Sequence, residues 1–306
     1  IAQSLHQIEA RKEVFQALYE AGIRFLPLKG YEMKCLYPRP EFRQMADVDV
    51  LIDPENTSRA REIMIHLGYR QKEALPHHDE YFRPPFVTVE VHRQMLLVGE
   101  SRQAYYDNIW DRALIDEENP GGYKLSPEDF YIYQIAHFEK HYSLMGSGIR
   151  SALDIYVYLN KFRTILNRDY IKEEFQKLNI YNFGTKMEYL SQFWFSKQQP
   201  DIKISKDELN EIQKNIFLSG VYGSLEFSRF KKMSNLHIEK GFKQTFHYFW
   251  TRIFTRKKDF KNSYPFLRKY PFLLPFCWFH RLIYVLLHKK QSIKRELELY
   301  KKVKEK

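Results

Sequence analysis

The octapeptide ADVDVLID, residues 46–53, decides how the N-terminal part of this 306-residue chain folds. Its side chains alternate strictly, with the valines and the isoleucine on one side and Asp47 and Asp49 on the other. Alternation with a period of two predicts a β-strand that has one buried face and one polar face. Asp47 and Asp49 therefore project from the same face of this strand.

Helical and strand patterns surround this segment. The run IRFLPL at residues 23–28 is typical of a short buried strand, and residues 80–84 and 87–95 form a predicted hairpin around Pro84-Pro85. The residues that show helical patterns or helix start and stop signals are 2–21, 31–37, 54–67, 126–142, 149–163, 168–179, 183–197 and 206–219. We therefore expect an α+β protein, in which a small mixed β-sheet with flanking helices precedes a helical domain.

Three parts follow from this order: an α/β core at 1–120, a helical domain at 121–240 and a basic, aromatic segment at 241–306. Aromatic residues make up 16% of the chain, which excludes general disorder. The last segment holds 17 Lys and Arg residues and 4 Asp and Glu residues, whereas the first 240 residues have a net charge of −2. We therefore expect the last segment to contact an anionic surface such as a membrane, and we expect no specific nucleic-acid ligand for the rest.

The most hydrophobic stretch, Tyr270–His288, contains two prolines, His280 and Arg281, which argue against a membrane span. It fits either a helix lying in the membrane interface or a buried helical hairpin of a soluble domain. Two cysteines cannot form a disulfide framework and favour a reducing compartment. We expect a cytoplasmic protein with peripheral attachment to the inner face of the membrane.

Asp47 and Asp49 are the first candidates for chemistry. Two carboxylates this close raise each other's pKa unless a cation lies between them, and hard oxygen ligands suit Mg²⁺, with Mn²⁺ as an alternative. Glu90 lies on a later predicted strand with the same polar parity, so it is a natural third ligand. Three such carboxylates could hold two Mg²⁺ ions about 4 Å apart, as in-line phosphoryl transfer requires. The alternative is a solvated strand edge.

A glycine turn precedes this strand in LPLKG, residues 26–30, and leads into a short predicted helix. Free N–H groups at a helix start favour phosphate, and Lys29 and Arg43 could neutralise a triphosphate, which places Lys29, Gly30 and Arg43 at a nucleotide. Neither the GxxxxGK[ST] loop nor GxGxxG occurs in the chain, so P-loop ATPases and Rossmann enzymes lose their main support.

The order of LKG, RxMxDVDVLI and VEVH resembles the DNA-polymerase-β-like nucleotidyltransferase superfamily, and more closely its uncharacterised bacterial members, over residues 20–160. The resemblance implies that Asp47, Asp49 and Glu90 are the metal ligands. It also implies Mg²⁺-dependent transfer of a nucleoside monophosphate from an NTP to an acceptor hydroxyl, on a small molecule, a sugar or a protein, with release of pyrophosphate. The alternative is a degenerate nucleotide-binding or membrane-associated protein of the same fold.

A second cluster lies in the predicted helical domain, in the pattern HxxKH followed by GxRxxxD. Its members could contact phosphate or acceptor, with the aspartate as a base; they are His137, Lys140, His141, Arg150 and Asp154. The alternative, favoured for Asp154, is a buried Arg–Asp pair and capping histidines that hold two helices together. His92 is a further candidate acceptor contact, and with His77 and His78 it could bind zinc, although no cysteine joins them.

Overall fold

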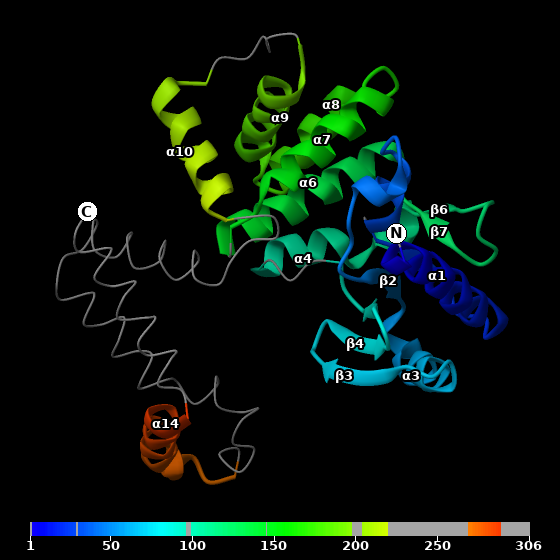
Figure 1. Cartoon of the computed structure of the whole chain (residues 1–306), viewed down its shortest axis with the longest axis vertical. Helices are drawn as coiled ribbons and strands as arrows, with labels where there is room; N and C mark the ends of the chain where they lie inside the picture. The colour runs from blue at the N-terminus through cyan, green and yellow to red at the C-terminus, as the bar shows by residue number, and fades with distance from the viewer. Residues whose placement is uncertain are drawn as a thin grey trace. The chain divides into compact units, whose positions relative to one another are not determined.

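A computed structural model describes residues 2–28, 30–95, 99–144, 146–197, 204–219 and 269–288 (Figure 1). Lys29 and most of the basic segment 241–306 lie outside these residues, so the predictions for them stay predictions. The chain divides into two compact units, Ile1–Ser143 with Ser147–Phe217 and Leu144–Gly146 with Leu218–Lys306. The α/β part and the predicted helices up to residue 217 thus belong to the first unit.

The described residues form a mixed five-stranded sheet. Its order is β1 (Phe25–Pro27), β2 (Val48–Ile52), β5 (Val87–His92), β4 (His78–Arg83) and β3 (Arg70–Ala74). Only the pairing of β2 with β5 is parallel. Strands β1, β2, β4 and β5 confirm the predicted ones, whereas β3 was not predicted because its sequence, RQKEA, is a hydrophilic and largely exposed edge strand without hydrophobic alternation.

The predicted helices are present within a few residues of their predicted ends. Their bounds are α1 (Ala2–Glu20), α2 (Gly30–Cys35), α3 (Thr57–His66), α6 (Pro127–Leu144), α7 (Ile149–Phe162), α8 (Arg168–Lys177), α9 (Tyr181–Phe195) and α10 (Lys206–Leu218). The elements that were not predicted are short: the helices α4 (Gly99–Asp107) and α5 (Ile109–Arg112), and the strands β6 (Leu114–Ile115) and β7 (Tyr123–Lys124), with 3-10 turns at Pro40–Phe42 and Pro54–Asn56.

The two faces of the sheet pack against different helices. Valines of β2 and β5 on one face, with Ile52, form a buried core with α1 and α3. On the other face Leu26, Leu28 and Leu51 join a larger core made chiefly by α6 to α9, the helical layer labelled in Figure 1. This core continues across residue 120, where the sequence analysis placed a domain boundary. The sheet and the helical layer are therefore packed directly together.

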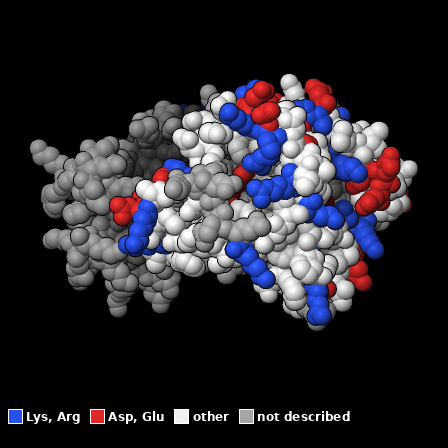
Figure 2. Space-filling model, turned by 90° about the horizontal axis from the view of Figure 1, so that it is seen from above, with Lys and Arg blue, Asp and Glu red and all other residues white. Residues whose placement is uncertain are grey.

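Apart from a few residues at and after the ends of α6 and α10, the described part of the second unit is helix α14 (Leu274–His288) with the 3-10 turn at Pro271–Leu273 before it. Cys277 is buried, whereas Phe276 and Phe279 are 71% and 72% exposed. Within the described parts of the chain, every helix is too short or too polar to cross a bilayer. On the face of the molecule drawn in Figure 2, blue basic and red acidic side chains alternate over the described surface.

Candidate active site

Strand pairing brings polar residues from three strands onto one face of the sheet. Asp49 of β2 is the register partner of Glu90 of β5, and His92 of β5 is the partner of His78 of β4. Cross-strand partners project from the same face, as do residues two apart along one strand. The four side chains therefore occupy one continuous patch, on the face that the helical layer covers.

The three predicted carboxylates converge in this patch. Asp47, Asp49 and Glu90 each offer a carboxylate oxygen, and the three oxygens lie within 4.8 Å of one another. All three residues are half-buried, so their charges are only partly solvated. An all-oxygen donor set on neighbouring strands suits Mg²⁺ or Mn²⁺. The structure thus places the predicted metal ligands together, with a donor chemistry that fits such ions.

His92 lies among these carboxylates rather than apart from them. Its Nε2 atom is 3.1 Å from Oδ1 of Asp49 and 3.2 Å from Oε2 of Glu90. Burial alone would lower the pKa of His92, but the hydrogen bonds and negative charges of Asp49 and Glu90 raise it to about 9. Without a bound metal ion, a protonated His92 would neutralise part of the carboxylate charge.

His78 completes the patch, and sequence reasoning missed its position. The sequence analysis named His78 with His77 and His92 as possible zinc ligands but began the predicted strand at residue 80, whereas His78 is the first residue of β4, directly across from His92. Its Nε2 atom lies 3.7 Å from Oε2 of Glu90, and burial lowers its pKa. The ring of His77 is 4.3 Å from that of His78, and burial lowers the pKa of His77 to about 4. The signal that could have placed His78 was the pairing of the two predicted hairpin arms.

Helix α6 presents a polar side to the same patch. Burial lowers the pKa of Lys140, while the charges of Glu90 and Asp49 act in the opposite direction. The Nε2 atoms of His137 and His141 are 3.1 Å apart. Lys140 is thus a cation within electrostatic reach of the carboxylates, as a phosphate contact would be.

Arg43 and Asp154, by contrast, form a buried ion pair. The Nε and Nη2 atoms of Arg43 donate to the two carboxylate oxygens of Asp154 at 2.8 and 2.9 Å, and Nη1 donates to the carbonyl of Gly30 at 2.9 Å. Tyr37 Oη donates to Asp154 at 2.7 Å. This geometry gives Arg43 a structural role in place of the predicted phosphate contact. It also supports the buried-pair alternative for Asp154, with Arg43 as the partner that Arg150 was expected to be.

Gly30 and Arg150 also have partners within the protein. The Gly30 N–H donates to the carbonyl of Leu28 at 2.6 Å, so this amide does not point freely at a ligand. A Cβ atom on Gly30 would lie 3.0 Å from Met45 Cε, so the glycine permits close packing. Arg150 Nη1 donates to the carbonyl of Gln44 at 2.9 Å. These contacts favour structural roles over the predicted phosphate contacts.

A pocket of about 330 Å³ lies at the C-terminal end of β2. Leu51, two residues after Asp49 and the register partner of His92, forms part of its wall. Most of the remaining lining is polar or aromatic and includes Arg24, Asp53, Gln94, Gln103 and Trp110. Several of these residues belong to or adjoin α4 and α5, which carried no sequence signal strong enough to predict them.

Comparisons with solved structures show remote similarity. The antibiotic-resistance factor ANT(2'')-Ia in solution is 13% identical, with a TM-score of 0.32 over 63% of this chain and 92% of its own. The crystal structure of ANT(2")-Ia with adenylyl-2"-tobramycin is 12% identical, with a TM-score of 0.31 over 63% and 98% of the two chains. An antigenic nucleotidyltransferase-like protein from Paracoccidioides brasiliensis is 16% identical, with a TM-score of 0.40 over 71% and 94%.

No curated protein matches this sequence. A family model does match it, over residues 1–196, and its description is "uncharacterised nucleotidyltransferase". The matched region contains the sheet, the carboxylate patch and helices α1 to α9. The chain therefore belongs to the family of uncharacterised nucleotidyltransferases.

Proposed function

We propose that this protein is an active, Mg²⁺-dependent nucleotidyltransferase that moves a nucleoside monophosphate from an NTP to an acceptor hydroxyl and releases pyrophosphate. The observation that carries the proposal is the convergence of the carboxylates of Asp47, Asp49 and Glu90 within 4.8 Å on one sheet face. Family membership supports the reaction class. The donor set supports the choice of a hard divalent ion, with Mn²⁺ as an alternative.

The position of each residue in the site determines the role that we assign to it in the reaction. Asp47, Asp49 and Glu90 would hold the divalent ions, which supply charge neutralisation at the phosphates and activation of the acceptor hydroxyl. Lys140 approaches the patch from α6 and would contact phosphate oxygens, where its half-buried ammonium is poorly screened. Lys29, by its place in the sequence before α2, is a second candidate for this contact.

The pocket beside Leu51 would receive the acceptor. Its volume of about 330 Å³ suits a small molecule, and its carboxylate and amide groups can exchange hydrogen bonds with hydroxyls. Asp53 is already fixed by Arg24, whose Nε and Nη2 atoms donate to it at 2.6 and 2.8 Å. The ring of Trp110 lies beneath the same guanidinium, 4.4 Å away. This preorganised polar wall favours a small polyhydroxylated acceptor such as a sugar.

The test is a screen of the four NTPs with Mg²⁺ against a panel of hydroxylated acceptors, with pyrophosphate release as the readout. Glu90→Gln should abolish release, whereas Glu80→Gln is a matched control. Glu80 is the register partner of Glu90 on β4, but its carboxylate binds Lys72 at 2.7 Å instead of joining the triad. Calorimetric NTP binding without turnover across the panel would support the degenerate, nucleotide-binding alternative and contradict the proposal.

We also propose that α14 attaches the protein to an anionic membrane surface. Four residues form an exposed stripe at helical spacing, each more than half exposed: Phe272, Phe276, Phe279 and Ile283. The sequence around them carries the excess positive charge of residues 241–306. Aromatic side chains next to Lys and Arg favour an interfacial helix on acidic lipids.

Sedimentation with vesicles tests this attachment. The full chain should sediment with vesicles that contain phosphatidylserine and remain in the supernatant with neutral ones. Phe276→Ser with Phe279→Ser should weaken sedimentation, whereas Phe42→Ser, at a 65% exposed phenylalanine of the first unit, should not. Equal sedimentation of all variants would contradict a role for α14.

A further inference from the structure

We propose that His78, Glu90 and His92 form a second metal site. This site would bind a divalent ion that accepts nitrogen ligands, as Zn²⁺ does. The site adjoins the carboxylates Asp47 and Asp49 and shares Glu90 with them. It deepens the proposed function by giving the same patch two ion sites of different chemistry. Ion binding at the histidines does not itself require nucleotide transfer.

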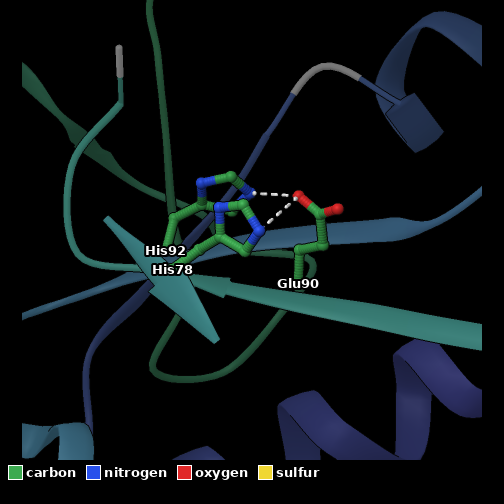
Figure 3. A group of neighbouring side chains, drawn as sticks. All are labelled: His78, Glu90 and His92. Atoms are coloured by element: carbon green, nitrogen blue, oxygen red, sulfur yellow. Dashed lines mark ion pairs between the residues drawn. The ribbon is translucent and has the colours of Figure 1, made fainter. Parts of the chain in front are cut away.

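The geometry places three ligand atoms around one point. His78 and His92 are register partners on β4 and β5, and Glu90 lies two residues before His92 on the same face. Oε2 of Glu90 is 3.2 Å from Nε2 of His92 and 3.7 Å from Nε2 of His78, and all three ligand atoms lie within 4.8 Å of one another. Figure 3 shows both imidazole rings directed at this one carboxylate oxygen.

The distances between these ligand atoms match those between two ligands of the same bound ion. Zinc lies about 2.0–2.2 Å from nitrogen and oxygen ligands, so two ligands of a tetrahedral ion are about 3.4 Å apart. The two distances from Glu90, 3.2 and 3.7 Å, lie on either side of that value. Small side-chain rotations would therefore suffice to coordinate an ion, without movement of the strands.

The donor chemistry distinguishes this site from its neighbour. Two imidazoles and one carboxylate accept a borderline ion and leave a fourth position open, as in His₂Glu zinc sites. Mg²⁺ prefers oxygen ligands and keeps its waters, so it would select Asp47 and Asp49 instead. Glu90 would be the common ligand, which links occupation of one site to that of the other.

The surroundings of His78 argue against a purely hydrogen-bonded cluster. His78 is only 9% exposed, and its Nδ1 atom has no hydrogen-bond partner among the described residues. Its Nε2 is 3.7 Å from Glu90, longer than a hydrogen bond. The Nε2 atom of His78 is therefore not committed to a hydrogen bond with Glu90, and both atoms could instead bind one ion.

The experiment is a Co²⁺ titration of the full chain without NTP. Visible absorption reports the coordination geometry, and paramagnetically shifted imidazole proton resonances report nitrogen ligation. We expect shifted signals from two histidines, displacement of Co²⁺ by Zn²⁺, and at least about tenfold weaker binding in His78→Gln and in His92→Gln. His66→Gln, at an exposed histidine of α3, should bind as the wild type does.

Asp47→Asn separates the two ion sites, because Asp47 belongs to the oxygen set alone. The variant should keep the shifted imidazole signals. Wild-type Co²⁺ affinity in both histidine variants, without shifted imidazole signals in the unmodified chain, would overturn this inference and leave His92 as a counter-ion of the carboxylates. His78→Gln serves as the second variant if His92→Gln fails to fold, since His78 makes fewer contacts with the carboxylates.

The outcome is independent of the proposed function. Mg²⁺-dependent pyrophosphate release together with histidine-independent Co²⁺ binding would contradict only the metal site. Histidine-dependent Co²⁺ binding without turnover of any NTP would support the metal site and contradict the proposed transferase.

Discussion

The two faces of strands β2 and β5 are made by alternate residues and have opposite properties. On one face Val50 and Val89 are fully buried under α1 and α3. On the other Asp49, Glu90 and His92 are half-buried beneath the helical layer. One face lowers the free energy of the fold by removing apolar surface from water, whereas the other holds several charges close together at a cost in stability.

Residues on the apolar face therefore contribute to stability, whereas the residues that alternate with them along each strand contribute to the proposed function. Without a bound metal ion, only a protonated His92 and the nearby ammonium of Lys140 would balance the carboxylates of Asp47, Asp49 and Glu90. Like charges held close together are typical of sites that await a cation. Substitutions on the apolar face should therefore change folding, and substitutions on the polar face should change activity with little loss of stability.

The largest effect is expected from Val50→Asp. The aspartate would place an unpaired carboxylate in the core between the sheet and α1, which costs about 4–5 kcal/mol or more and should prevent cooperative folding. Circular dichroism during urea denaturation measures this. Asp49→Val, one residue away on the polar face, is the matched control and should keep a cooperative transition. A Val50→Asp protein with the wild-type urea midpoint would contradict the assignment of the two faces.

Asp49→Asn should have the next largest effect, this time on activity. Loss of one metal-binding carboxylate removes several kcal/mol of transition-state stabilisation, so pyrophosphate release should fall on the order of 10³-fold. Its free energy of unfolding should change by no more than about 1 kcal/mol, because the lost charge pair with His92 is offset by the relief of repulsion from the other two carboxylates. Turnover above a tenth of the wild-type rate would show that Asp49 holds no essential ion.

Asp154→Ala should destabilise the fold by about 3 kcal/mol, because it leaves the buried Arg43 guanidinium unpaired. Chemical denaturation measures the loss. The control is Asp53→Ala, which breaks the pair with Arg24; that arginine side chain is 45% exposed, so the expected loss is below about 1 kcal/mol. Equal losses in the two variants would contradict the structural role of the Arg43–Asp154 pair.

The smallest effect concerns Glu32 of α2, a further acid near the polar face. Burial raises the pKa of Glu32 to about 7, so the folded state binds its proton more tightly than the unfolded state does. As the pH rises from about 4.5 to about 7, the wild type should lose stability relative to Glu32→Gln; because the Glu32 side chain is 32% exposed and lies 3.7 Å from Arg11, the loss should be on the order of 1 kcal/mol. Urea midpoints of both proteins at pH 5 and pH 8 measure this. A difference that does not depend on pH would show that the carboxyl is normally solvated.

Local patterns were sufficient to predict much of the fold. The alternation in residues 46–53 and the helical periodicities predicted the central strand and the main helices, because each element buries one face of its own sequence. The edge strand β3 could not be predicted, because Arg70–Ala74 has little to bury and is held by pairing with β4. Short exposed elements depend on their neighbours rather than on their own composition.

The candidate site was predictable only in part, for a related reason. Asp47, Asp49 and Glu90 lie on the polar sides of predicted strands, so the pairing of these strands in one sheet accounts for the convergence of their carboxylates. The partner of Arg43 did not follow, because Asp154 is 111 residues away and the pair depends on how α7 packs. The i, i+4 spacing of Arg150 and Asp154 indicated a pair between these two residues. Spacing within one helix gives no information about contacts with a distant segment such as the one that contains Arg43.

The parallel pairing of β2 with β5 has a consequence for how the patch comes into being. Asp49 and His92 are 43 residues apart, and the hairpin of β3 and β4 lies between their strands in the chain. Loop-closure entropy must be overcome before these side chains meet, so the unfolded polypeptide offers no preformed ion site. Divalent ions that bind the assembled patch would therefore act as thermodynamic ligands of the native state and raise its melting temperature in proportion to the logarithm of their concentration.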